Sequence, residues 1–340
     1  MMKKLVIISN ESTFENDGKY FCDNLDMKST PEELSKHYEV NLIARKSKKV
    51  RSHEIKVKNI KICNSFFTFL FQILRLVKDV DSKFLLISIT PYTFFACIFL
   101  RFFRKKPIVY LRSDGYGEYK VILGFIGPII YHIMFSIVSK ISHLISCRDY
   151  ILKGKKGSLV YPSQLNSSWL SNIKTSNFKD IKLLYVGRIR KEKGIFSLVK
   201  LIESLQKISL TIVGAEKNSK EAINQNNVNI YEIESKTQNL IKYYDDHNIF
   251  ILPSFTEGYP MSLLEALARM RPVIVFEEIK HVIGDKKGIF VSKRNSNNLL
   301  ETINYIKENI LEIQEEMKKN HLPTNKDFIK EMSNLIFKLN

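Results

Sequence analysis

Cysteine and histidine are too few and too scattered in this chain to suggest a metal centre. The 340 residues include four cysteines and seven histidines, and no subset of them has a metal-ligand spacing. The cysteines, at positions 22, 63, 97 and 147, suit reduced thiols better than a disulfide framework. The sequence therefore predicts a protein of a reducing compartment that works without a metal ion.

No stretch of the sequence is suited to span a membrane or to direct secretion. The amino terminus is basic, but its apolar run is too short for a signal peptide before Ser9-Asn10-Glu11. The longest apolar stretch, residues 121–145, is interrupted by Gly124, Pro128 and Lys140. We therefore expect a cytoplasmic protein.

Acidic residues are in deficit, mainly in the first half of the chain. Lys and Arg number 53 against 35 Asp and Glu, a formal net charge of +18. Residues 1–175 hold 28 basic and 14 acidic residues, whereas residues 176–340 hold 25 and 21. A nucleic-acid-binding protein would be as basic, but no helix-turn-helix, zinc or single-strand aromatic motif is present. The first half of the chain is therefore expected to bind an anionic partner other than a nucleic acid.

Two carboxylates lie around a predicted strand-to-helix turn in the second half. Residues 248–252 form a short apolar run typical of a buried parallel strand, and a helix is predicted from Met261. Glu257 lies in the turn and Glu265 in the helix. The free N–H groups at the start of such a helix suit a phosphate. A carboxylate near a helix start can also simply stabilise the helix dipole.

A second predicted strand, residues 181–186, leads into a cationic loop bounded by Gly187 and Gly194. The loop contains four basic residues, among them Arg188 and Lys193. Open α/β sheets bind ligands at such strand-to-helix connections. Together with the carboxylate turn, this loop predicts a diphosphate site.

The two segments resemble the C-terminal domain of the retaining glycosyltransferases of family 4, which have the GT-B fold. The resemblance covers residues 180–310 and rests on the order and spacing of Gly187-Arg188-x4-Lys193-Gly194 and Pro253-Ser254-x2-Glu257-Gly258-x-Pro260-x4-Glu265-Ala266. It implies an α/β protein with two Rossmann-like, doubly wound parallel-sheet domains facing a cleft. We expect an acceptor-binding domain at residues 1–170, a nucleotide-sugar domain at 171–323 and a final helix at 324–340 that packs back on the first domain.

The resemblance also implies a role for each matching residue. Arg188 and Lys193 are expected to bind the donor diphosphate, Glu257 to contact the transferred sugar and Glu265 to accept hydrogen bonds from the ribose hydroxyls. Cations and helix N–H groups can stabilise a leaving diphosphate without a metal, so no cofactor is expected beside the co-substrate, a UDP-sugar. Further donor-binding residues are expected around the same turns: Gly187, Gly258, Tyr259, Pro260, Met261, Ser262 and Leu263.

The chain departs from the family pattern in two places. Met270 stands where relatives usually have glycine, and we expect it to be a packing residue. The first predicted strand, residues 4–9, leads into a loop at 10–18 without the glycine pair that many relatives carry.

The first half alternates short apolar runs with helical patterns, which is typical of a parallel sheet covered by helices. Asp114 follows a predicted strand at 108–111 and is expected to position or deprotonate the acceptor hydroxyl. A structural Asp-Gly turn is the other interpretation. Basic and large apolar residues mix in the segments 66–78, 94–106 and 121–145, which predicts contact with an anionic membrane surface. Ordinary core helices with solvated ends are the alternative.

We therefore expect a metal-independent, retaining glycosyltransferase, cytoplasmic and peripheral at the inner face of the cell membrane. It would transfer a sugar from a nucleoside diphosphate sugar to a lipid-linked glycan acceptor in surface polysaccharide biosynthesis. Two alternatives of the same fold are a non-catalytic partner subunit and a sugar-nucleotide epimerase.

Overall fold

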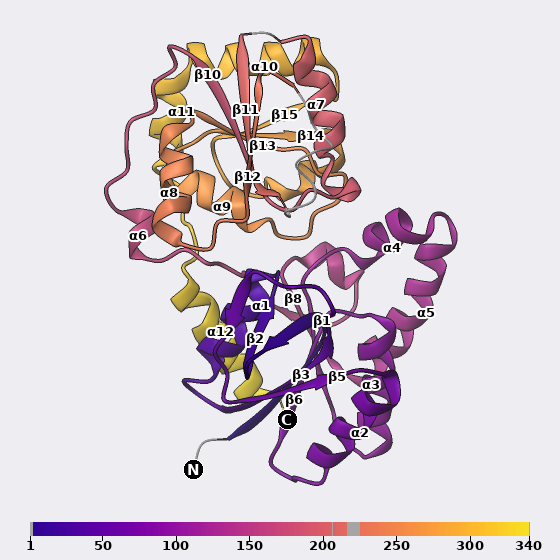
Figure 1. The fold of residues 1–340 in the computed structure, drawn as a ribbon. Helices are drawn as coiled ribbons and strands as arrows, with labels where there is room; N and C mark the ends of the chain where they lie inside the picture. The colour runs from indigo at the N-terminus through magenta and orange to yellow at the C-terminus, as the bar shows by residue number, and fades with distance from the viewer. Residues whose placement is uncertain (1–2, 206, 216–224, 340) are drawn as a thin grey trace. The chain divides into compact units, whose positions relative to one another are not determined.

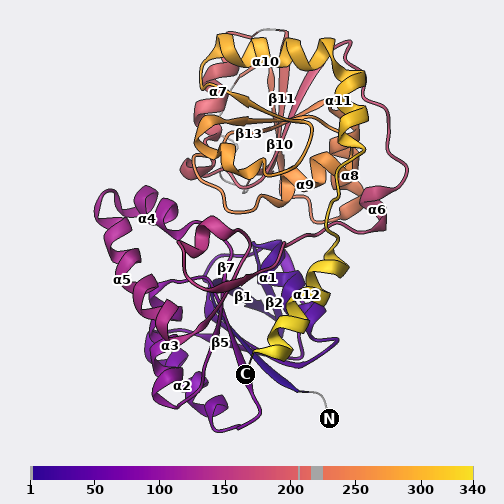
Figure 2. The ribbon, with the colours of Figure 1, turned by 180° about the vertical axis from the view of Figure 1, so that it is seen from behind.

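The structure, a computed structural model, consists of two compact units and describes residues 3–205, 207–215 and 225–339. Unit 1 runs to Pro162 and includes the residues from Lys326 onward, whereas unit 2 comprises Ser163–Asn325. Figures 1 and 2 show the two units from opposite sides. The chain therefore enters unit 2 at residue 163 rather than 171, and its last helix belongs to unit 1.

Unit 1 is built on a sheet whose parallel part is doubly wound. The parallel strands follow the order β5-β3-β1-β6-β7-β8-β9, so the direction of winding reverses between β1 and β6. β2 and β4 extend β1 as an antiparallel edge. The strands are β1 Lys4–Asn16, β2 Lys19–Cys22, β3 Glu39–Lys46, β4 His53–Ile55, β5 Asn59–Cys63, β6 Lys83–Ile87, β7 Ile108–Leu111, β8 His143–Ser146 and β9 Gly157–Leu159.

The first strand is longer than the sequence suggested. Instead of ending in a loop after Ser9, β1 continues to Asn16 and pairs with β2 as a hairpin. Asp17 and Gly18 form its two-residue turn, with φ values of 49° and 73°. An Asp-Gly pair favours this hairpin turn because both of its central residues need positive φ. The expected loop at 10–18 is therefore wrong.

Helices cover both faces of the sheet in unit 1. α1 and α12 lie on one face and α2, α3 and α5 on the other (Figures 1 and 2). Leu5, Ile7 and Tyr110 of the sheet pack with Phe328 and Met332 of α12. Among the described residues, no helix is both long and apolar enough to cross a membrane. The helices are α1 Leu25–Leu34, α2 Phe66–Val77, α3 Pro91–Phe102, α4 Gly115–Leu123, α5 Ile126–Ile141 and α12 Asn325–Lys338.

Unit 2 contains a fully parallel sheet with the order β12-β11-β10-β13-β14-β15, which reverses between β10 and β13. Its strands are β10 Ile181–Val186, β11 Ile208–Ala215, β12 Val228–Glu232, β13 Ile249–Leu252, β14 Val273–Phe276 and β15 Ile289–Ser292. Its helices are α6 Ser167–Leu170, α7 Ile195–Glu203, α8 Thr237–Asp246, α9 Met261–Ala268, α10 Ser296–Glu308 and α11 Ile310–Met317.

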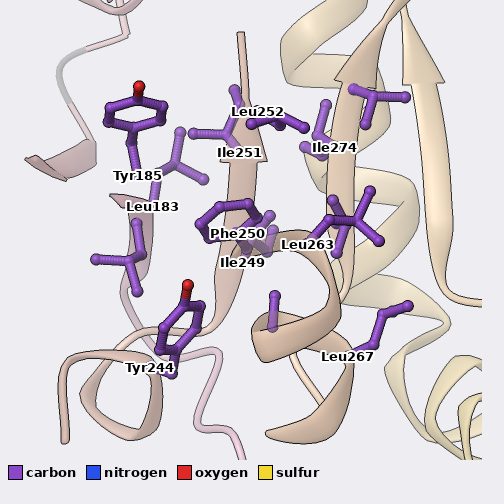
Figure 3. Close-up of a cluster of buried hydrophobic side chains, with 14 of the residues drawn as sticks. Leu183, Tyr185, Tyr244, Ile249, Phe250, Ile251, Leu252, Leu263, Leu267 and Ile274 are labelled. Carbon is purple, nitrogen blue, oxygen red and sulfur yellow. The ribbon is translucent and has the colours of Figure 1, made fainter. Parts of the chain in front are cut away.

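The core of unit 2 is centred on the two middle strands. Figure 3 shows Leu183 and Tyr185 of β10 beside the residues of β13, with Leu263 and Leu267 of α9 packed nearby. All four residues of β13 are buried. Burial on both faces explains why these strands are continuous apolar runs in the sequence, without polar alternation.

The segment between residues 163 and 180 is held by two buried arginines and is not a free linker. Arg269 makes two bonds of 2.9 Å to the Asp245 carboxylate and donates to three carbonyl oxygens within residues 169–172. Arg271 donates to a further carbonyl of the segment at 2.9 Å. Both arginines are 1% exposed. The segment's backbone therefore supplies the acceptors that buried guanidinium groups require.

Met270 follows α9 and is one of the two places where the sequence departs from the expected family pattern. It adopts a φ of 58°, in the left-handed region that glycine favours, and packs against the core as expected. A methionine therefore occupies a backbone conformation that glycine adopts more easily.

We expect Asp245→Asn to lower the stability of unit 2 by about 3–5 kcal/mol, because two buried guanidinium groups would lose their carboxylate. Denaturant unfolding followed by tryptophan fluorescence measures this loss, since the single tryptophan, Trp169, packs against Tyr244. The exposed neighbour Asp246 is the matched control, and Asp246→Asn should change stability by less than about 0.5 kcal/mol. Equal effects of the two substitutions would contradict the assignment.

Candidate functional site

The two predicted motifs meet at the point where the strand order of unit 2 reverses. β10 and β13 are neighbours, and their loops, residues 187–194 and 253–260, leave the carboxyl edge of the sheet side by side. Ligands of open α/β sheets bind at this position, where the connections on either side lead to opposite faces. The structure thus brings together the segments that the sequence singled out.

Two glycines allow the loops to approach each other closely. A Cβ atom on Gly194, whose φ is 66°, would lie 1.9 Å from the carbonyl oxygen of Pro253. A Cβ on Gly214, at the end of β11, would lie 2.3 Å from the carbonyl oxygen of Gly187. The Phe255 N–H also donates to a carbonyl of the first loop at 2.9 Å. The loops therefore form one continuous surface that larger residues at these glycines would disrupt.

Lys193 and Glu257, one from each loop, form an ion pair. The distance from Lys193 Nζ to Glu257 Oε1 is 2.6 Å, and the Ser254 hydroxyl donates to the same oxygen at 2.6 Å. The Glu257 side chain is only 10% exposed. An ammonium group has three N–H donors, so Lys193 can bind an anion while it keeps its contact with Glu257.

Arg188 follows Gly187 at the start of the first loop, two residues after the end of β10, and its side chain is half-buried. The buried Tyr185 hydroxyl donates to the Arg188 carbonyl at 3.0 Å. Burial raises the pKa of Tyr185, so this phenol stays neutral and keeps its donor proton. The interior of the sheet thereby fixes the backbone from which the guanidinium extends.

Glu265 is a buried carboxyl group on α9, 5% exposed. The Tyr244 hydroxyl of α8 donates to Glu265 Oε2 at 2.7 Å. Burial raises the pKa of Glu265 to about 7, although the hydrogen bond from Tyr244 acts in the opposite direction. At neutral pH this carboxyl group is therefore near the midpoint of its titration.

The remaining predicted donor residues form the end of the second loop and the first turn of α9. Tyr259, Met261 and Ser262 are partly exposed, whereas Gly258 and Pro260 are buried. The Leu263 side chain belongs to the core, so only its backbone can meet a ligand. The first N–H groups of a helix have no acceptor within it, and together with the dipole they attract an anion.

Asp114 belongs to unit 1, where it follows β7 and directly precedes α4. Its side chain makes no capping hydrogen bond to that helix, and Lys153 Nζ lies 4.0 Å from its Oδ1. This buried oxygen accepts no hydrogen bond from any residue that the structure describes. This oxygen can therefore accept a hydrogen bond from a ligand hydroxyl.

Sequence reasoning missed Arg294, which follows β15 at the same edge of unit 2. Its guanidinium lies between the rings of Phe255 and Phe276, at 4.3 and 4.2 Å from their centroids. It donates to the Pro253 carbonyl at 3.0 Å and to Glu278 Oε1 at 2.7 Å. Arg294 therefore supports the loop that carries Glu257. Its place directly after a parallel strand was a signal available in the sequence.

The sequence was expected to contain no Asp-x-Asp element, and this is wrong, because residues 79–81 are Asp-Val-Asp. It lies between α2 and β6 in unit 1, and Asp79 pairs with Lys4 at 2.6 Å. The hydrogen bond from Lys4 holds the pKa of Asp79 below its usual range. No group of three or more metal-ligand side chains is gathered in the described part of the chain.

Two doubly wound α/β units, each with a sheet whose strand order reverses, are consistent with the GT-B class of fold. Residues 170–322 match the family model of the glycosyl transferases group 1. The matched residues make up most of unit 2, which is therefore similar in sequence to the group 1 glycosyl transferases.

Two curated relatives share parts of this sequence. The putative teichuronic acid biosynthesis glycosyltransferase TuaC of Bacillus subtilis is 30% identical over 122 residues, which are 35% of this chain and 31% of TuaC. An uncharacterized glycosyltransferase of Haemophilus influenzae is 28% identical over 137 residues, covering 36% of this chain and 38% of the relative. The matches thus span about a third of the length of these relatives.

Solved structures match the fold over nearly the whole chain. Sucrose-phosphate synthase from Thermosynechococcus elongatus has a TM-score of 0.70 at 14% identity, with 99% of both chains covered. HepE from Anabaena, solved in complex with UDP and glucose, has a TM-score of 0.72 at 11% identity and covers 99% of this chain and 100% of its own. At such identities the likeness concerns the fold, and the predicted GT-B fold is confirmed.

The raised pKa of Glu265 makes stability depend on pH. Between its ordinary value of 4.5 and about 7, the native state keeps a proton that the unfolded chain loses. Stability therefore falls as the pH rises through this window, by up to about 3 kcal/mol from this group. Glu265→Gln keeps an acceptor for Tyr244 but does not titrate.

Denaturation of both proteins at a series of pH values from 4.5 to 7.5 tests this dependence. The variant should gain stability relative to the wild type as the pH rises. Every other titrating group cancels in the comparison, so a difference that does not change with pH would show that the carboxyl group is not buried as described.

Proposed function

We propose that this chain is a glycosyltransferase whose donor is a nucleoside diphosphate sugar. The observation that carries this proposal is the Lys193–Glu257 pair, which joins the two loops at the strand reversal of unit 2. Arg188 and the first turn of α9 belong to the same loops. The match of residues 170–322 to the group 1 glycosyl transferases supports it, as does the fold shared with a protein solved with UDP and glucose.

The first role of the site is to stabilise the leaving diphosphate. Breaking the bond between the anomeric carbon and the diphosphate leaves negative charge on the phosphate oxygens. Arg188, Lys193 and the N–H groups of α9 stabilise that charge, and fixed donors of this kind are most effective where they need no rearrangement. We propose that they do so without a metal ion.

The two carboxyl groups are assigned to the two ends of the donor. Glu257, next to Lys193, accepts hydrogen bonds from hydroxyl groups of the transferred sugar. Glu265 accepts hydrogen bonds from the ribose. Such bonds favour the ionised carboxylate, so they lower the pKa of Glu265 when the nucleotide binds. We propose uracil as the base of the nucleotide, in line with the expected UDP-sugar.

We assign acceptor binding to unit 1, with Asp114 as the group that takes the proton of the acceptor hydroxyl. Its buried oxygen has unused acceptor capacity, and Lys153 Nζ lies 4.0 Å from it. We propose attack on the face from which the diphosphate departs, with retention of the anomeric configuration.

The acceptor is proposed to be lipid-linked, because helices of unit 1 expose wide apolar faces. α5 buries Tyr131, Phe135 and Val138 against the unit, yet its opposite face is apolar too. The exposed fractions on that face range from 37% to 59%, for Ile126, Ile129, Ile130, Ile133 and Ile137. Phe125, just before this helix, is 83% exposed. A soluble surface rarely carries so continuous an apolar stripe without a partner.

The neighbouring helices extend this face and favour an anionic bilayer as the partner. On α2 and α3, Phe67 and Phe102 are 81% and 80% exposed. α2, α3 and α5 contain no Asp or Glu and carry Arg75, Arg101 and Lys140 in their last turns. Apolar side chains can enter the interface while the cations reach lipid phosphates. We therefore propose a peripheral location at the inner face of the cell membrane, where a lipid-linked glycan of surface polysaccharide assembly is available.

Nucleotide binding is tested by thermal shift against UDP, GDP, ADP and CMP with EDTA present. UDP should raise the melting temperature most, because a ligand that binds only the native state stabilises it. Arg188→Ala and Glu265→Ala should weaken UDP binding at least tenfold. Lys191→Ala is the matched control, since this exposed lysine lies in the same loop, and it should leave the affinity within about twofold.

The donor assignment would be overturned if no nucleotide shifted the folded protein. It would also fail if Lys191→Ala and Arg188→Ala weakened UDP binding equally. In transfer assays, Lys193→Ala should lower kcat more than its effect on stability explains, because its charge is needed most when the diphosphate leaves.

Membrane contact is tested by co-flotation with vesicles that contain phosphatidylglycerol. Ile129→Ser/Ile133→Ser should reduce the bound fraction at least tenfold, since each buried isoleucine contributes about 1.5–3 kcal/mol. Leu300→Ser/Leu311→Ser removes two exposed apolar side chains from unit 2 and serves as the control. Equal flotation of the two variants would rule out this helical face as the contact.

A further inference from the structure

Unit 1 contains a cavity at one edge of its sheet, and Asp114 lies at the opposite edge. The cavity has a volume of about 850 Å³ and is lined by the first residues of β1, β6 and β7. Because these strands are parallel, their starts share one edge and their ends the other. Asp114 follows the end of β7, so this cavity is separate from the proposed acceptor site.

The lining of the cavity is strongly basic. Seven of the lining residues are Lys or Arg and three are Asp or Glu. Four of the cations already have partners in the protein: Lys3 lies 4.0 Å from the centre of the Phe337 ring, and three other lysines are hydrogen-bonded. Lys4 pairs with Asp79 at 2.6 Å, Lys105 donates to the Asp79 carbonyl at 2.8 Å, and Lys83 donates to the Ile336 carbonyl of α12 at 2.5 Å. These three lysines hold the walls of the cavity together.

Three other cations at the cavity are exposed: Arg101, Arg104 and Lys106. Their side chains make no hydrogen bond or ion pair with any residue in the described ranges. Arg101, in the last turn of α3, has an ordinary role beside the negative end of the helix dipole. Such a role does not account for two more cations placed beyond the helix end.

The backbone conformation of Arg104 is one that glycine adopts more easily than arginine. Its φ is 57°, and the Lys105 N–H reaches back to the Leu100 carbonyl at 3.0 Å, as in a glycine-terminated helix. An L-residue in this left-handed conformation costs about 1–2 kcal/mol relative to glycine. The protein therefore carries a cation at a position where glycine would be more stable.

We propose that this cavity binds a phosphate group, borne by an anionic lipid or by a soluble phosphorylated ligand. Guanidinium groups match phosphate oxygens in a two-bond geometry, and the three exposed cations Arg101, Arg104 and Lys106 provide the compensating charge. Phe102, between two of these cations in sequence, is 80% exposed and belongs to the apolar face described above. The cavity is a second site that does not depend on the proposed transferase activity.

The test uses Arg104→Gly/Lys106→Gln in the full chain. Lys48→Gln/Lys58→Gln removes the same charge from exposed positions of unit 1 that do not line the cavity. Binding of pyrophosphate is measured by calorimetry, in the wild type and in Arg188→Ala to exclude the donor site. Flotation with phosphatidylglycerol and phosphatidylcholine vesicles gives the second arm.

The cavity variant should melt no lower than the control variant, because glycine relieves the backbone at position 104. It should nevertheless lose at least tenfold in pyrophosphate binding, in binding to the anionic vesicles, or in both. Loss with pyrophosphate alone identifies a soluble ligand, and loss with the anionic vesicles alone identifies a lipid headgroup. If the two variants behave alike in both arms, or if the wild type binds neither probe, the proposal is overturned.

Discussion

The candidate donor site depends on the close contact between the loops that follow β10 and β13. The absence of a side chain at Gly194 lets the first loop reach the Pro253 carbonyl, and this contact sets Lys193 against Glu257. The ion pair is partly buried, so its charges are fixed before any ligand arrives. A site whose donors are already placed loses little energy to rearrangement when negative charge develops on a leaving group.

Helix α8 supports the site and also anchors the segment through which the chain enters unit 2. On α8, Tyr244 donates to Glu265, and the next residue, Asp245, holds Arg269 and through it the segment before β10. Two neighbouring residues of α8 thus contact α9: Asp245 binds Arg269 at the end of α9, and Tyr244 binds the carboxyl group of Glu265 within it. Burial of these groups makes the contacts strong and their loss costly.

Unit 1 combines features that are unfavourable for an isolated soluble domain. α5 is apolar on both faces, and Arg104 occupies a backbone position suited to glycine. Asp114 keeps a buried oxygen without a hydrogen bond in the part that the structure describes. Each feature is intelligible if its partner is another molecule: a bilayer for the helix, a phosphate for the cation and a hydroxyl for the carboxylate.

The alternation of strands and helices in both units was predictable from the sequence, because apolar runs and helical periodicity reflect local burial. The motif loops were predictable too, since glycine and charge next to a parallel strand point to a ligand edge. The hairpin at Asp17-Gly18 was not predicted although its turn is local, because residues 9–16 before it are mostly polar and form no apolar run.

Only the tertiary structure decided which polar groups meet. Lys193 and Glu257 are 64 positions apart, and Arg269 reaches a segment about 100 positions earlier in the chain. The raised pKa of Glu265 likewise depends on how deeply α8 and the core bury it. Sequence determined the strands, turns and charges of this protein because these follow from neighbouring residues. Pairing, burial and the accessible faces came from the fold, because they depend on segments that only packing brings together.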